Sequence, residues 1–318
     1  MPVLIFIDQS EGIIKKSTPE AISFGASIAE LLGTTAEGIL LGSFNDDPAT
    51  LGKYGLKKIY HLADPGLDHP DGQVYTKIIS EVAKISGADV IIFSNNLHGK
   101  AIAPQLSVAL QAGLVTGAVG LPDISSGFTV RKSVFSGKAF ATISINTPVK
   151  IITLNPNAFP VKEPGGVAEL VKPDIVPGSA KTKVVSVNKI KGEIPLSEAE
   201  KVVSGGRGLK GPENWKMIEE LAHLLGAATA CSRPVADAGW RPHHEHVGQT
   251  GLAIAPNLYF AIGISGSIQH LAGVNRSKVI VVINKDPEAP FFKAADYGIV
   301  GDAFEVVPKI IDAVKQLR

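Results

Sequence analysis

Short apolar runs alternate with stretches of helical periodicity along most of the chain, and this alternation limits the folds it can adopt. Unbroken apolar runs of about five residues rich in valine and isoleucine are typical of strands buried on both faces. The stretches between them repeat apolar residues at helical spacing, as amphipathic helices do. Strands separated by helices pair in parallel, so the sequence predicts an α/β fold with mainly parallel sheets. The predicted strands span residues 3–7, 35–41, 59–62, 89–94, 201–204, 227–231, 258–262 and 279–283, further β structure is expected over 128–152, and the predicted helices span 19–32, 75–85, 101–110, 212–225, 267–272 and 303–317.

The alternation breaks once, between residues 155 and 195, and resumes at Lys201. Six prolines punctuate this stretch, namely Pro156, Pro160, Pro164, Pro173, Pro177 and Pro195. Such punctuation is typical of linkers, although residues 183–190 also alternate like an edge strand. The length of 318 residues fits two domains of about 100 to 200 residues each. We therefore predict two three-layer α/β domains, an N-terminal one over residues 1–190 and a C-terminal one over residues 191–318.

Charge and cysteine content argue against several protein classes. The 31 basic and 30 acidic side chains nearly balance, whereas proteins that bind nucleic acid usually carry a basic face. The single cysteine, Cys231, can form neither an intrachain disulfide nor an iron–sulfur site, which favours a reducing compartment. The N-terminal apolar run meets Asp8 almost at once, and no later run approaches about 20 residues, so no integral membrane segment is expected.

Glycine-rich and polar residues gather at four predicted strand ends in the second half, at residues 204–208, 232–234, 263–270 and 284–286. In an open α/β sheet, ligands bind beyond the carboxyl ends of the strands. Glycines let the backbone approach a ligand, and helix N-termini offer N–H groups that suit phosphates. The GxxxxGK[ST] pattern is absent, which disfavours a P-loop. Each segment alone is compatible with a plain turn or a surface arginine, but together they predict one ligand-binding edge.

A run of His-His-Glu-His at residues 243–246 has two interpretations, a metal site or a polar loop. Adjacent loop residues cannot easily all face one ion, and no further cysteine or histidine lies near in sequence. We favour the loop and predict no metal. The order of residues offers no Ser–His–Asp arrangement and no convincing carboxylate pair, so no catalytic residues are predicted.

The second half resembles the alpha subunits of electron-transfer flavoproteins. The resemblance rests on the segments VVSGGRGLKGPENW, CSRPVADAGW, VGQTG, LYFAIGISGSIQHLAG and VVINKDPEAPFFKAADYGIVGD. The arrangement LYxAxGISGxxQHxxG followed by INxDxxAPxF is highly specific to that family. The match is strong over residues 201–318 and looser before them. There HGKAIAPQLSVALQAGLVTG is similar to the family's GRDLAPRLAxxLxxGLVTD, with departures at Lys100 and Gly117.

The resemblance implies that the C-terminal domain is Rossmann-like and binds FAD in a groove facing a beta subunit. An arginine and a histidine donor would stabilise the negative charge of a reduced flavin, and a hydroxyl near N5 would tune the other side. The residues that it implies along the groove are Arg207, Gln249, Thr250, Gly263, Ser265, Gly266, Gln269, His270, Asn284 and Asp302, with Ser232 and Arg233 close to the flavin ring.

The resemblance further implies an electron carrier rather than an enzyme, working as a heterodimer with an electron-transfer flavoprotein beta subunit. It would take electrons from flavin dehydrogenases, such as the acyl-CoA dehydrogenases of fatty acid beta-oxidation, and pass them to electron-transfer flavoprotein quinone oxidoreductase. The expected location is the bacterial cytoplasm, or the mitochondrial matrix if a presequence has been removed.

Two alternatives stay open. The chain could be the alpha subunit of an electron-bifurcating flavoprotein that uses NADH and ferredoxin, because the distinguishing site would lie mostly in the other subunit. It could also be a nucleotide-binding regulatory or NAD-dependent deacylase-like module, although it lacks the zinc cysteines that such deacylases often carry.

Overall fold

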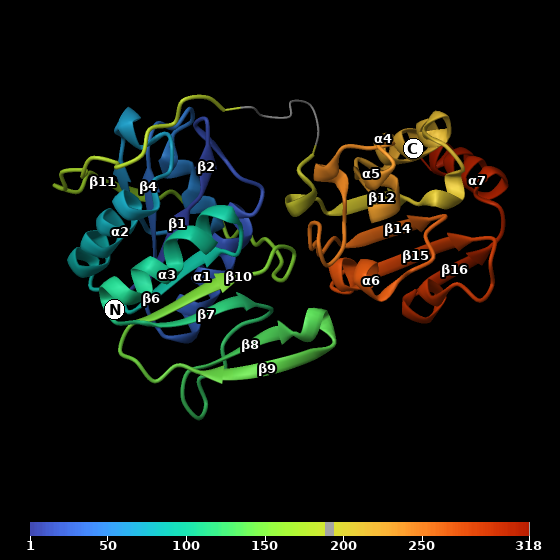
Figure 1. The fold of residues 1–318 in the computed structure, drawn as a ribbon. Coiled ribbons are helices and arrows are strands. Elements are labelled where there is room, and N and C mark those ends of the chain that lie inside the picture. The colour runs from blue at the N-terminus through green and yellow to red at the C-terminus, as the bar shows by residue number, and fades with distance from the viewer. Residues whose placement is uncertain (188–193, 318) are drawn as a thin grey trace. The chain divides into compact units, whose positions relative to one another are not determined.

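The computed structural model describes residues 1–187 and 194–317, which form two compact units (Figure 1). The first unit comprises residues 1–134 and 140–187, and the second comprises residues 135–139 and 194–317. The predicted boundary between residues 190 and 191 lies outside the described residues. The edge strand predicted over residues 183–190 is wrong for its described part, because residues 183–187 form no strand and their valines are exposed.

A nine-stranded sheet runs through the described part of the first unit, in the order β11-β5-β4-β1-β6-β10-β7-β8-β9. Its neighbours pair in parallel from β11 to β7, and β8 runs antiparallel to β7. The strands are β1 (Val3–Ile7), β4 (Ala36–Leu41), β5 (Lys58–Leu62), β6 (Val90–Ser94), β7 (Gly113–Ala118), β8 (Thr129–Val134), β9 (Ala139–Ser144), β10 (Lys150–Leu154) and β11 (Glu169–Val171), beside a small hairpin of β2 (Gln9–Ser10) and β3 (Ile13–Ile14).

Alternate residues of β1 show why this unit has three layers. Ile5 and Ile7 pack with α1 (Thr18–Leu31) on one face of the sheet. Leu4 and Phe6 pack on the other face with α2 (Gly72–Ser86) and α3 (Leu97–Leu110). All four side chains are nearly inaccessible to solvent. An unbroken apolar strand therefore buries both of its faces, as the sequence predicted.

The second unit contains a five-stranded parallel sheet in the order β13-β12-β14-β15-β16. Counted along the chain this order is second, first, third, fourth and fifth, which is the flavodoxin-type doubly wound arrangement. The order reverses between β12 and β14. The elements are β12 (Lys201–Gly205), α4 (Lys216–Leu225), β13 (Ala228–Cys231), α5 (Arg233–Asp237), β14 (Leu258–Ile262), α6 (Ile268–Val274), β15 (Val279–Asn284), β16 (Tyr297–Val300) and α7 (Ala303–Gln316).

Helices cover both faces of this second sheet. Val203 and Ile262 pack with α4, α5 and α7, whereas Val202 and Ala261 pack on the side of α6. The predicted α/β class with mainly parallel sheets is confirmed. The sequence did not predict α5, the β2–β3 hairpin, β7, β11 or β16. Every residue of β16 is exposed, so this edge strand lacks the apolar burial pattern that identified the others.

None of the helices in residues 1–187 and 194–317 combines the length and the apolarity needed to cross a membrane.

Candidate functional site

A cavity of about 610 Å³ lies beyond the carboxyl ends of the second sheet, where the strand order reverses. Ligands of doubly wound sheets bind at such a reversal. Its floor includes buried side chains and its rim is exposed and polar. The lining residues are Arg207, Gly208, Ser232, Arg233, Pro234, His246, Val247, Gly248, Gln249, Thr250, Gly263, Ile264, Ser265, Ser267, Gln269, His270, Asn284 and Asp286.

Glycines bring the loops after β12 and β14 into backbone contact. The Gly206 N–H donates to the Ile262 carbonyl at 2.9 Å, and the Gly208 N–H donates to the Gly263 carbonyl at 3.0 Å. A Cβ atom on Gly206 would lie 2.2 Å from the Gly263 oxygen, and one on Gly208 would lie 2.7 Å from the Gly263 Cα. Gly263 itself has a φ of +62°, in the left-handed region that favours glycine. Residues with side chains could not bring these two strand ends so close.

The segment after residue 245 is held against both the sheet and α6. The Val247 N–H donates to the Cys231 carbonyl at 3.1 Å, which extends the edge of β13. A Cβ on Gly273 in α6 would lie 2.5 Å from the Gly248 nitrogen, so the helix and this loop touch through glycine. This packing brings Thr250 to the rim of the cavity, although no predicted strand or helix contains it.

Arg233 lies at the mouth of the cavity, in the first turn of α5. Its Nε lies 3.3 Å from the Asp237 Oδ2, and its Nη1 donates to the Thr250 Oγ1 at 3.4 Å. The arginine side chain is 62% exposed. The guanidinium is therefore oriented by two surface groups and keeps most of its donors free for a ligand.

His270 forms part of the cavity's floor and contacts two buried aromatic side chains. Its Nε2 lies 2.8 Å from the Tyr259 hydroxyl oxygen. The ring meets Phe291 edge-on, with centroids 5.7 Å apart. Burial lowers the pKa of His270 to about 4, and the charge of His246 acts in the same direction. Its Nδ1 is buried and forms no hydrogen bond with any described residue. His270 is thus a neutral, fixed ring with one polar atom unsatisfied.

Ten of the twelve residues predicted from the sequence line this one cavity. The other two, Gly266 and Asp302, lie outside the lining. The Asp302 carboxylate caps α7 by accepting the Phe304 N–H at 2.9 Å. Gly266 has a φ of +83°, and a Cβ there would lie 2.6 Å from the Phe291 backbone. Both residues have structural roles that the sequence motifs did not reveal.

His246 was not predicted from the sequence, yet it lines the cavity with 8% of its surface exposed. Burial lowers its pKa, and nearby Asp237 and Arg233 act in opposite directions. Its neighbour Glu245 turns the other way, and both of its oxygens accept from Arg241. Within the run at 243–246, Glu245 therefore forms an ion pair with Arg241, whereas His246 lines the cavity. Across residues 1–187 and 194–317, no group of three or more His, Cys, Asp or Glu side chains could hold a metal ion. The adjoining VGQTG segment was the one signal that could have identified His246.

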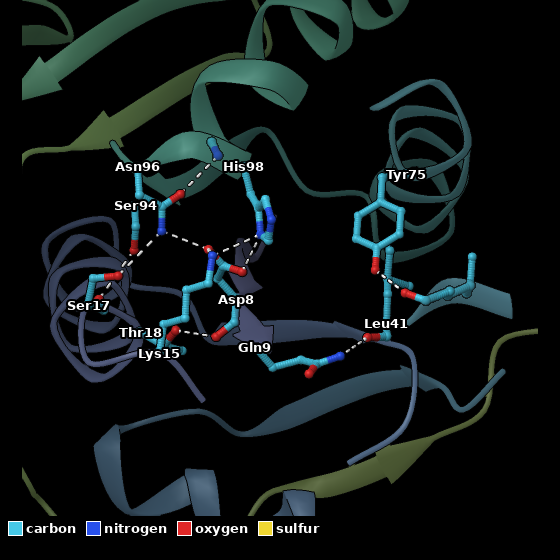
Figure 2. A network of polar contacts seen from close by, with 12 residues as sticks. Asp8, Gln9, Lys15, Ser17, Thr18, Leu41, Tyr75, Ser94, Asn96 and His98 are labelled. Carbon is cyan, nitrogen blue, oxygen red and sulfur yellow. Dashed lines mark hydrogen bonds and ion pairs between the residues drawn. The ribbon is translucent and has the colours of Figure 1, made fainter. Parts of the chain in front are cut away.

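The first unit has a polar cluster in the corresponding place, at the carboxyl ends of β1 and β6 (Figure 2). The Asp8 Oδ1 lies 2.7 Å from the His98 Nδ1, and its Oδ2 lies 3.1 Å from the Lys15 Nζ. Asn96 donates to Oδ2 at 2.7 Å. Burial raises the pKa of Asp8, but the His98 hydrogen bond and the Lys15 charge outweigh it and hold that pKa below its usual value. Side chains of the protein thus satisfy this carboxylate.

Comparison with known proteins agrees with the geometry of the second unit. A family model described as "Electron transfer flavoprotein domain" matches residues 3–189. A second, "Electron transfer flavoprotein FAD-binding domain", matches residues 195–275. The chain is 37% identical to an electron transfer flavoprotein subunit alpha of Bacillus subtilis, covering 99% of this chain and 98% of the relative. It is 36% identical to one of Syntrophomonas wolfei, covering 98% of each, and 33% identical to Protein FixB of Clostridium saccharobutylicum, covering 99% and 96%.

Proposed function

The chain belongs to the electron transfer flavoprotein alpha-subunit family, and from this premise we propose that its second unit binds FAD and carries electrons within a heterodimer. The observation that carries the proposal is the cavity beyond β12 to β15. Its volume of about 610 Å³ suits a cofactor. We also propose that all FAD contacts of this chain come from residues beyond 200.

The side chains and backbone of the cavity fit such a cofactor. Gly208 and Gly263 both line the cavity and carry no side chain, so a ligand can approach the main chain closely there. The first turn of α6 offers N–H groups that have no partner within the helix and suit a pyrophosphate. The buried Nδ1 of His270, which no described residue satisfies, lacks the partner that a buried polar atom requires.

The residues around the cavity would bind and orient the cofactor's ring system. FAD, when bound, supplies the ability to accept and release electrons. Arg233 would place positive charge at the mouth, where a planar guanidinium can donate two hydrogen bonds to one acceptor. Thr250 and Ser265 would add hydroxyl donors from the rim. The buried floor would keep water from that side of the ring and so strengthen each polar contact.

An exposed rim supports the proposal that a partner completes the site. Gln249, Thr250 and Gln269 all line the cavity and are exposed. An extended dinucleotide on such an open edge would lose much of its burial unless another chain covered it. The proposed cover is an electron-transfer flavoprotein beta subunit. The proposed donors are flavin dehydrogenases such as acyl-CoA dehydrogenases, and the proposed acceptor is a quinone oxidoreductase.

Co-expression of the chain with its beta subunit tests the proposal. We expect a yellow complex with one FAD per heterodimer, and loss of FAD when the alpha chain is purified alone. Two FAD per heterodimer would favour the electron-bifurcating alternative. A folded complex without flavin would contradict FAD binding and favour a nucleotide-binding module.

A further inference from the structure

His270 and Tyr259 form a buried polar pair in the second unit, with the buried Ser204 beside the Tyr259 hydroxyl. Tyr259 is fully buried in β14, and His270 is 5% exposed in α6. Their contact joins the Tyr259 hydroxyl to the His270 Nε2 at 2.8 Å. Phe291 stacks on the tyrosine ring at 6.3 Å and meets the histidine ring edge-on. The three rings hold one another, so the imidazole has little freedom to turn.

Both members of the pair are neutral near neutral pH. Burial raises the pKa of Tyr259, so the phenol keeps its proton. Burial lowers the pKa of His270 to about 4, so the imidazole carries only one proton. A neutral imidazole has one N–H donor and one acceptor nitrogen, and the hydrogen bond at one nitrogen determines the state of the other.

The direction of the Tyr259 hydrogen bond therefore determines where the histidine proton lies. If the phenol donates to Nε2, the proton of His270 must lie on Nδ1. If Nε2 donated instead, the phenol would have to donate to the buried Ser204 hydroxyl beside it, and Nδ1 would be a buried lone pair. The unprotonated imidazole nitrogen is a good acceptor for the phenol proton. The Val247 carbonyl also lies close enough to favour a proton on the ring, although it makes no hydrogen bond with Nδ1.

We propose that Tyr259 is a positioning residue: its hydroxyl donates to Nε2 and holds His270 as the Nδ1–H tautomer in the floor of the cavity. This inference rests on the proposed function in one respect, because the cavity that His270 lines is the proposed FAD site. The tautomer itself is a property of the chain. Tyr259 would act on the cofactor only through His270.

Nitrogen-15 NMR of the complex labelled at histidine tests the proposal directly, with the His270 signals assigned by their loss in His270→Gln. We expect a protonated Nδ1 and an unprotonated Nε2 in the wild type. Tyr259→Phe keeps the ring and removes the hydroxyl, so the tautomer should shift toward Nε2–H. The matched control is Tyr297→Phe, at a tyrosine 66% exposed on β16, which should leave the signals unchanged.

The reduction potential of bound FAD gives a second measurement. Tyr259→Phe should weaken the preference for the reduced cofactor by about tenfold, or about 59 mV for one electron. An Nε2–H tautomer in the wild type would overturn the proposal, even if Tyr259→Phe failed to fold. An unchanged tautomer in Tyr259→Phe would overturn it as well. The same spectra of the chain without flavin would still decide the tautomer if the complex proved to bind none.

Discussion

The Asp8 carboxylate lies 2.7 Å from the Nδ1 of His98, although 90 residues separate them in the chain. Asp8 follows β1, His98 is the second residue of α3 just after β6, and these two strands pair in parallel. The contact therefore lies where the strand order of the first sheet reverses. The second sheet has its cavity at its own reversal. One unit thus fills this position with an ion-paired cluster, and the other leaves room for a ligand.

Replacing Asp8 with asparagine should destabilise the first unit by about 3 kcal/mol near neutral pH. This is the low end of the range for breaking a buried ion pair, because Lys15 and His98 each keep 18% of their side-chain surface exposed. The folded-state pKa of Asp8 is below its usual value of 3.8. Its contribution is therefore complete above about pH 4 and is lost as the pH falls through the folded-state pKa. The difference between variant and wild type should shrink in acid.

Urea unfolding can assign this effect to one unit. Both tryptophans, Trp215 and Trp240, belong to the second unit, so their fluorescence reports on it while circular dichroism reports on both. Asp8→Asn should shift the circular dichroism transition much more than the fluorescence transition. Asp46→Asn, at an exposed position, is the control. Equal shifts in the two variants would show that the cluster stabilises nothing.

Gly206→Ala should separate the loops after β12 and β14, because the new Cβ would lie 2.2 Å from the Gly263 carbonyl oxygen. The obstacle is backbone, which cannot rotate away as a side chain can. We expect a loss of about 3 kcal/mol in the fluorescence-monitored unfolding of the second unit, together with less bound FAD. Gly120→Ala, where nothing lies within 4 Å, should change neither quantity. Full FAD content in Gly206→Ala would contradict the proposed role of this glycine contact.

Arg233→Ala should lower the reduction potential of bound FAD by about 60 mV, equivalent to about 1.5 kcal/mol for one charge-assisted hydrogen bond. We expect the low end of the usual range because the side chain is 62% exposed. Arg233→Lys should give an intermediate value, since it keeps the charge and loses the planar fork. Lys278→Ala removes one charge from the opposite edge of the sheet and serves as the control in a stepwise reductive titration. A potential in Arg233→Ala that matches the control would make Arg233 an ordinary surface residue.

Cys231 should be unreactive toward thiol reagents in the folded chain. It is fully buried in β13, and burial raises the pKa of its thiol to about 12, with Glu245 acting in the same direction. The reactive thiolate is therefore scarce at neutral pH and inaccessible. Colorimetric titration should find no free thiol in the native protein and one per chain in denaturant. Rapid native labelling would show that β13 opens easily.

Much of the fold could be predicted from local patterns. The strand Val279–Asn284 and the helix Ala303–Gln316 lie where apolar periodicity placed them, with shifts of one residue at their ends. The periodicity works because it records which face of an element is buried, and burial is the dominant stabilising term. β16 was not predicted because every residue of this edge strand is exposed, so it shows no periodic burial.

For the site, the sequence predicted the location of the residues but not the role of each one. Polar residues at strand ends predicted the correct edge of the second sheet, because parallel strands bring their carboxyl ends together. Sequence alone could not separate His246, which faces the cavity, from Glu245, which is paired with Arg241. It also could not show that Asp302 caps α7. Neighbouring residues of one loop point in different directions, and only packing determines which.

The sequence by itself therefore determined the α/β class, the position of most elements and the edge where polar residues gather. Tertiary structure alone decided the strand order of each sheet and the pairing of Tyr259 with His270. It also decided that the ion-paired cluster around Asp8 lies where the strand order of the first sheet reverses. The physical reason is the range of each interaction. Periodic burial involves residues of a single helix or strand, so it can be recognised from the order of residues along the chain. Hydrogen bonds and ion pairs across a sheet join residues whose distance depends on how every strand between them is ordered.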